Sequence, residues 1–89
     1  MNMDNILTIS LSLRCRKMSH DFIRPFDANA KKFAMACVHA AAMMGNASHD
    51  DVTTDMVLYF PNSGVVIQQY NDLTVDELSR VFDELPNYI

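Results

Sequence analysis

The sequence Phe33-Ala-Met-Ala-Cys-Val-His-Ala-Ala-Ala-Met-Met44 decides the fold, because this central run is apolar apart from one side chain, His39. Ala and Met are strong helix formers, Asp27 lies where an N-cap is expected, and Gly45-Asn46 suits a left-handed helix end. The run therefore predicts a helix over residues 28–44. A helix that is apolar nearly all round is buried on two sides or contacts a partner.

The predicted helix has two apolar faces. The face expected to pack on a sheet comprises Ala30, Phe33, Cys37, Ala40, Ala41 and Met44, flanked by Ala34 and Val38. The opposite face comprises Met35, Ala36, His39, Ala42 and Met43. The C-terminal helix could cover that face, but no other later segment is long enough to cover it fully. We therefore expect it to form the interface of a homodimer.

Strands are predicted on both sides of this helix. In residues 7–15, apolar side chains alternate with Thr, Ser and Arg, which is typical of a strand with one solvent-exposed face. Residues 17–26 match neither period and contain Pro25, so we expect an irregular connection. Residues 54–60 and 65–70 predict a hairpin around Pro61-Asn62-Ser63-Gly64. Its core-facing residues should be Met56, Leu58 and Phe60, with Val65 and Ile67 among their cross-strand neighbours.

The last helix has the sharpest boundaries in the sequence. Thr74 and Glu77 have capping-box spacing, Leu73 and Leu78 form a hydrophobic staple, and Pro86 ends the helix. The expected fold is α+β, in the order β-α-β-β-α, with a three-stranded, mainly antiparallel sheet and two helices on one face. Residues 1–89 should form a single small domain.

The composition is that of an ordered globular protein, with 49% hydrophobic and 20% charged residues, two Gly and three Pro. The N-terminus carries Asp4 where a secretory signal would carry bases. The central apolar run is shorter than the roughly 20 residues that span a bilayer. We therefore expect a cytoplasmic protein without membrane contact, in which Cys15 and Cys37 are buried thiols.

Charge is distributed unevenly along the chain, which has a net charge of −4. Residues 14–32 carry six bases and two acids, whereas residues 50–89 carry eight acids and one base. Either set could bind a partner, or both could be solvated surface. The basic set comprises Arg14, Arg16, Lys17 and Arg24. The acidic set comprises Asp76, Glu77, Asp83 and Glu84.

Catalytic and cofactor-binding motifs are not visible in the sequence. The two Gly belong to no phosphate-binding pattern, and the chain has neither a Cys pair nor two His at metal-ligand spacing. His20 and His49 are each followed by Asp, a common arrangement in loops, and His39 is expected in the core or in an interface. We therefore expect no enzymatic activity, no cofactor and no metal.

These observations favour a non-enzymatic protein–protein interaction module, a small acidic homodimeric binder or inhibitor. Small inhibitors of phage or mobile-element origin, including anti-CRISPR and anti-restriction proteins, are similar in size and acidity, and the partner class includes nucleic-acid-handling proteins. One alternative is a nucleic-acid-binding regulator that uses the basic segment 14–32, although the sequence pI near 5.0 disfavours direct nucleic-acid contact. The other is a structural oligomerising protein without a separate partner.

Overall fold

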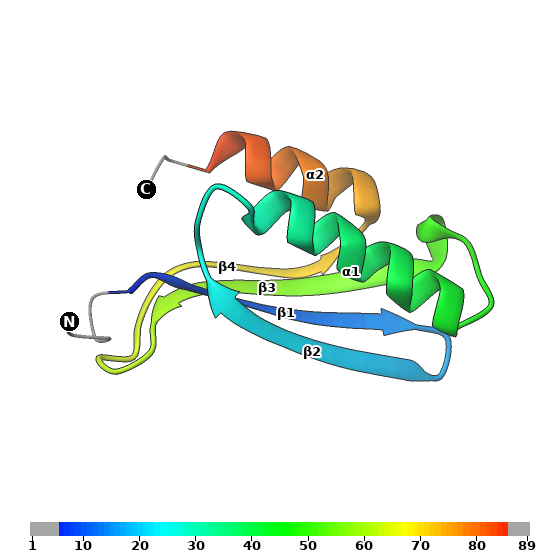
Figure 1. Ribbon diagram of the computed structural model, residues 1–89, viewed down its shortest axis with the longest axis horizontal. Helices are drawn as coiled ribbons and strands as arrows, with labels where there is room; N and C mark the ends of the chain where they lie inside the picture. The colour runs from blue at the N-terminus through cyan, green and yellow to red at the C-terminus, as the bar shows by residue number, and fades with distance from the viewer. Residues whose placement is uncertain (1–5, 86–89) are drawn as a thin grey trace.

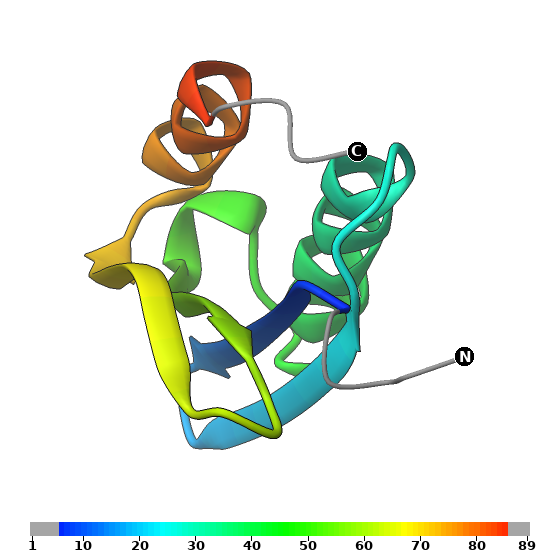
Figure 2. The ribbon, with the colours of Figure 1, turned by 90° about the vertical axis from the view of Figure 1, so that its left-hand side faces the viewer.

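The computed structural model describes residues 6–85, which form four strands, two α-helices and one short 3-10 helix. In chain order these are β1 (Thr8–Cys15), β2 (Met18–Pro25), α1 (Ala30–Met44), the short 3-10 helix η2 (His49–Asp51), β3 (Val52–Phe60), β4 (Val65–Leu73) and α2 (Val75–Glu84). The strands form one antiparallel sheet in the order β2-β1-β3-β4. Both helices lie on the same face of this sheet (Figure 1), as the view along the sheet also shows (Figure 2).

Strand β1 is the predicted first strand, and it lies in the middle of the sheet. Its alternation places Ile9, Leu11 and Leu13 in the core, each with 1% or less of its surface exposed. On the neighbouring strand β3, Leu58 pairs with Ile9 and Met56 with Leu11, so the same face is apolar across both central strands. The helices cover this face and complete the core.

The prediction of three strands in the order β-α-β-β-α is wrong, because residues 18–25 form strand β2 instead of an irregular connection. Strand β2 is an edge strand, and His20, Phe22 and Arg24 are its half-buried residues, so its inner face lacks a continuous apolar pattern. Pro25 is its last residue, a position that an edge strand tolerates. The tight turn from β1 is made by Arg16 at φ 57°, and Arg gives no turn signal in a sequence.

Helix α1 begins two residues later than predicted, and its N-cap is Asn29 instead of Asp27. The Asp27 carboxylate accepts a hydrogen bond from the Asn29 N–H and forms an ion pair with Arg24. At the other end, Asn46 takes the left-handed conformation with φ 52°. Gly45 has an ordinary helical φ of −82°, so its small size must serve another purpose.

The buried face of α1 also differs from the predicted one. Ala34, Val38 and Ala41 are buried as expected. Ala42, predicted on the opposite face, is also buried, whereas Ala40 and Met44 are exposed. The reason is that α1 contacts β1 and β2 with one side and α2 with the adjacent side. Its buried surface therefore extends beyond the side that faces the sheet, toward α2 and η2.

The C-terminal hairpin and the start of the last helix are confirmed, with Met56 and Leu58 buried as predicted. Phe60 is only half-buried and does not belong to the core, and Pro86, predicted to end the helix, lies outside the described residues. Gly64 closes the β3–β4 turn at φ 74°, and its N–H donates to the Phe60 carbonyl. Thr74 caps α2 as predicted: its hydroxyl accepts from the Glu77 N–H at 3.2 Å, and the Glu77 carboxylate accepts from the Thr74 N–H at 2.9 Å. Strand β4 runs to Leu73, three residues beyond the predicted end.

The outer face of the sheet is held by a polar network. Arg14 on β1 donates to both carboxylate oxygens of Asp55 on β3, at 2.8 and 3.1 Å, and to Asp72 on β4 at 2.7 Å. The Asp72 N–H also donates a hydrogen bond to the Asp55 carboxylate. Asp72 has a φ of 57° and lies where the β3–β4 register is irregular. The hydrogen bond from Arg14 lowers the pKa of the Asp55 carboxyl.

Candidate functional site

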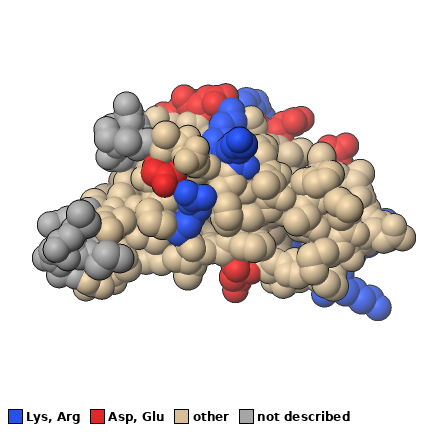
Figure 3. All heavy atoms as spheres, viewed as in Figure 1, with Lys and Arg blue, Asp and Glu red and all other residues tan. Residues whose placement is uncertain are grey.

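The acidic set predicted from the sequence lies on the outer side of α2, and we call it the acidic α2 face: Asp76, Glu77, Asp83 and Glu84. All four residues are exposed. Asp83 forms an ion pair with Lys31 of α1 at 2.6 Å, and Glu77 caps the helix. Figure 3 shows acidic side chains along the edge of the molecule formed by α2, with basic side chains between them, and α2 itself carries Arg80. Among residues 6–85, Asp76 and Glu84 have no ion-pair partner, so their charges face solvent.

The basic set does not form one surface. Arg14 lies on the outer face of the sheet, where Asp55 and Asp72 neutralise it. Arg24 pairs with Asp27 and places its guanidinium 4.7 Å from the centroid of the Phe33 ring. Basic side chains are correspondingly spread over the view in Figure 3. Arg16 and Lys17, at the β1–β2 turn, are the members of this set that have no ion pair within the described part of the chain.

The five residues predicted for a dimer interface have different surroundings. Ala42 is buried within the protein, and Met35 is half-buried against the core, so these two offer little surface to a partner. Ala36 and His39 are exposed, and Met43 is 68% exposed. Together with the exposed Ala40 and Met44 they form what we call the α1 outer face: Ala36, His39, Ala40, Met43 and Met44.

Two histidines that are distant in sequence are brought together at the C-terminal end of α1. His39 Nδ1 lies 3.1 Å from His49 Nε2, and the two rings meet edge to face with centroids 5.3 Å apart. The pair borders a surface hollow of about 280 Å³ that Met43, Ala47 and Ser48 also line. Spacing along the chain does not predict this contact, because it depends on the turn between α1 and η2.

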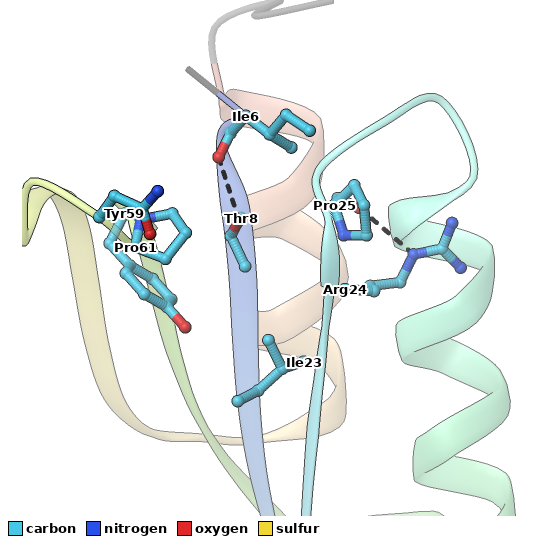
Figure 4. A pocket seen from close by; sticks show the side chains of 8 residues that line it. Ile6, Thr8, Ile23, Arg24, Pro25, Tyr59 and Pro61 are labelled. Carbon is cyan, nitrogen blue, oxygen red and sulfur yellow. Dashed lines mark hydrogen bonds between the residues drawn. The ribbon is translucent and has the colours of Figure 1, made fainter. Parts of the chain in front are cut away.

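A second hollow, of about 310 Å³, lies on the outer face of the sheet at the end where β1 begins and β2 and β3 end. Figure 4 shows Ile6 and Thr8 of the β1 segment between Tyr59 and Pro61 on one side and Ile23 on the other. Arg24 points away from this hollow toward α1. The lining is mainly apolar and contains no grouping of catalytic side chains.

The remaining candidate groups have structural surroundings. His20 and Asp21 lie on opposite faces of β2: Asp21 accepts from Ser12 at 2.5 Å on the outer face, and the buried His20 Nε2 has no hydrogen-bond partner in the described residues. Cys15 and Cys37 are free buried thiols as predicted, and burial raises the pKa of Cys37. No group of three or more His, Cys, Asp or Glu side chains that could hold a metal occurs between residues 6 and 85.

Comparison with known proteins gives no relative: no protein-family model matches the sequence, and no curated protein or solved structure matches it. None of the helices in the described residues is both long and apolar enough to cross a membrane.

Proposed function

We propose that this protein is a non-enzymatic interaction module, a small acidic binder or inhibitor that docks a basic region of another protein on the acidic α2 face. Charge complementarity of this kind gives specificity and fast association. Nucleic-acid-handling proteins belong to the proposed partner class, because they carry basic surfaces.

One observation supports this proposal over a nucleic-acid-binding regulator: half of the bases in residues 14–32 form ion pairs within the protein. Three of the six bases in residues 14–32, namely Arg14, Arg24 and Lys31, form intramolecular ion pairs. A duplex-binding surface needs Lys and Arg gathered on one face and free to replace counterions. The acids of α2 instead share one exposed side of a helix, and Asp76 and Glu84 are free to pair with a partner.

The test reverses charge on either side of the molecule without disturbing intramolecular contacts. Asp76→Lys with Glu84→Lys alters the acidic α2 face and leaves the Thr74–Glu77 cap and the Lys31–Asp83 pair in place. Arg16→Glu with Lys17→Glu is the matched control, with a charge change of the same size. A partner is first isolated by affinity capture from the native host with the wild-type chain, and its dissociation constant is then measured for each variant.

We expect the α2 variant to bind this partner at least about tenfold more weakly, equivalent to about 1.4 kcal/mol. The control should bind as the wild type does, and raising the salt concentration should weaken wild-type binding. An unchanged dissociation constant for the α2 variant would contradict the proposal. Loss of binding only in the control would favour the nucleic-acid-binding alternative.

We further propose that the protein self-associates through the α1 outer face. Met43 and Met44 are 68% and 58% exposed, and the Ala side chains beside them permit close approach of a second helix. Removing one Met side chain from water contributes about 1.5–3 kcal/mol, and a two-fold axis would count each residue twice. This contribution can exceed the entropic cost of association only if both Met residues are buried.

A further inference from the structure

We propose that His39 and His49 form a binding site for a divalent transition-metal ion such as Zn²⁺. One ring nitrogen of each histidine faces that of the other at 3.1 Å on the surface of the protein. Neutral imidazole is the commonest protein ligand for such ions. The site lies apart from the acidic α2 face, shares His39 with the α1 outer face, and does not rest on either part of the proposed function.

The spacing of the two nitrogens suits a shared ion. Nitrogens bound to one Zn²⁺ at roughly 2.0–2.1 Å in tetrahedral geometry lie about 3.3 Å apart. His39 Nδ1 and His49 Nε2 are a few tenths of an ångström closer than this, and both residues are exposed, so small side-chain rotations would admit the ion. Their edge-to-face arrangement, with an interplanar angle of 68°, keeps the rings from stacking against each other.

Both imidazoles are carried by fixed backbone. His39 lies within α1, one turn before the helix ends, and the left-handed Asn46 directs the chain back toward it. His49 is the first residue of η2, and Ser48 and Asp51 cap that turn through a capping box. Because both backbones are already ordered, metal binding would restrict only side-chain rotamers.

The surroundings favour a cation and leave room for the rest of its coordination sphere. Asp50 and Asp51 follow His49 in η2, which places two carboxylates on the same short element. The adjoining hollow of about 280 Å³ can hold the water molecules that complete a site with two protein ligands. Such an open site binds metal more weakly than a closed structural site with four protein ligands.

The proton balance needs no additional reactant. Without metal, one of the facing nitrogens donates a hydrogen bond to the other. When the ion binds, that proton moves through solvent to the outer nitrogen of the same ring, and both facing lone pairs become available. The metal site thus replaces a single N–H···N hydrogen bond between the same two atoms.

The test is zinc binding by equilibrium dialysis and calorimetry, with Zn²⁺ alone as the probe. His39→Ala and His49→Ala should each weaken binding by at least the roughly 10- to 100-fold that loss of an outer-shell partner costs. Combining them should add little, because either change destroys the chelate. His20→Gln, which removes the third imidazole of the chain, and Asp76→Lys with Glu84→Lys should leave binding unchanged.

A second measurement on the unaltered chain does not depend on the stability of any variant. On addition of zinc, the imidazole nitrogen resonances of His39 and His49 should shift together, and those of His20 should not. Equal zinc binding by the wild type and the doubly substituted chain would overturn the proposal. A zinc affinity no higher than that of free imidazole would also overturn the proposal, because two chelating rings must bind zinc more tightly than one ring does.

Discussion

Replacing Gly45 with Ala should destabilise the protein because of one close contact. A Cβ added at Gly45 would lie 2.7 Å from Cys15 Sγ, and ordinary carbon contacts lie about 3.5–4.0 Å apart. Gly45 follows the last residue of α1, and Cys15 is the last residue of β1. The absence of a side chain at Gly45 therefore sets how closely α1 can approach the sheet.

The expected magnitude follows from two opposing terms. Overpacking of this kind costs about 1–3 kcal/mol. Because φ at Gly45 is −82°, Ala is free of backbone strain there and returns about 0.4–1 kcal/mol through the entropy of the unfolded chain. We expect a net loss of about 1–2 kcal/mol, and each kcal/mol lowers the melting temperature by roughly 4–8 °C in a domain of this size.

Urea unfolding followed by circular dichroism, in a double-mutant cycle with Cys15→Ala, measures this contact directly. Removing Sγ should relieve most of the cost of Gly45→Ala and leave only the tight contact with the Ala41 carbonyl oxygen at 3.3 Å. Gly64→Ala is the matched control: its added Cβ meets nothing within 4 Å, but φ is 74°, so its cost of about 1 kcal/mol should be the same with either residue at position 15. If Gly45→Ala has the same effect in both backgrounds, the reasoning is refuted.

Three further predictions concern the polar network, the cap of α2 and self-association. Arg14 lowers the pKa of Asp55, so the contribution of this pair is present above the usual Asp pKa of about 3.9 and is lost as pH falls through the lower folded value. Asp55→Asn should lower the free energy of unfolding by roughly 1 kcal/mol at neutral pH and make it depend less on pH below about pH 4. Identical pH dependence of the free energy of unfolding in the variant and the wild type would contradict this. Thr74→Ala should cost about 1 kcal/mol in urea unfolding, whereas Thr53→Ala, outside any helix cap, should cost less. Met43→Glu with Met44→Glu should give folded monomers in sedimentation experiments, and a wild-type chain that is already monomeric at high concentration would exclude self-association through α1.

Local signals in the sequence were sufficient to predict most of the secondary structure. The capping box at Thr74, the turn ending in Gly64 and the alternation in β1 all depend on residues a few positions apart. Strand β2 could not be predicted in this way, because its inner residues His20 and Arg24 are polar and its turn residue Arg16 is atypical. An edge strand buries little surface, so the hydrophobic period that marks a strand is weak there.

The candidate sites show the same division between local and tertiary information. The acidic α2 face follows from helical spacing alone, and the structure leaves its four residues on one exposed element. The outer face of α1 differs from the predicted one: Ala42 is buried where the chain turns from α1 toward η2, and Met44 is exposed. The pairing of His39 with His49 required the geometry of the Asn46 turn, for which spacing along the chain offers no guide.

The strand order has a consequence for how the chain folds. The hairpins β1–β2 and β3–β4 each join neighbours in sequence, whereas the central pair β1–β3 joins Cys15 to Val52 across the loop formed by residues 16–51. Closing that loop costs entropy before the central contacts form, and non-local pairings of this kind slow folding. We expect the two hairpins to form early and the β1–β3 seam, together with the docking of α1, to make up the rate-limiting barrier. Core substitutions in this seam, such as Leu11→Ala, should therefore slow refolding, while truncation of the exposed Val65 side chain in β4 should leave the refolding rate almost unchanged.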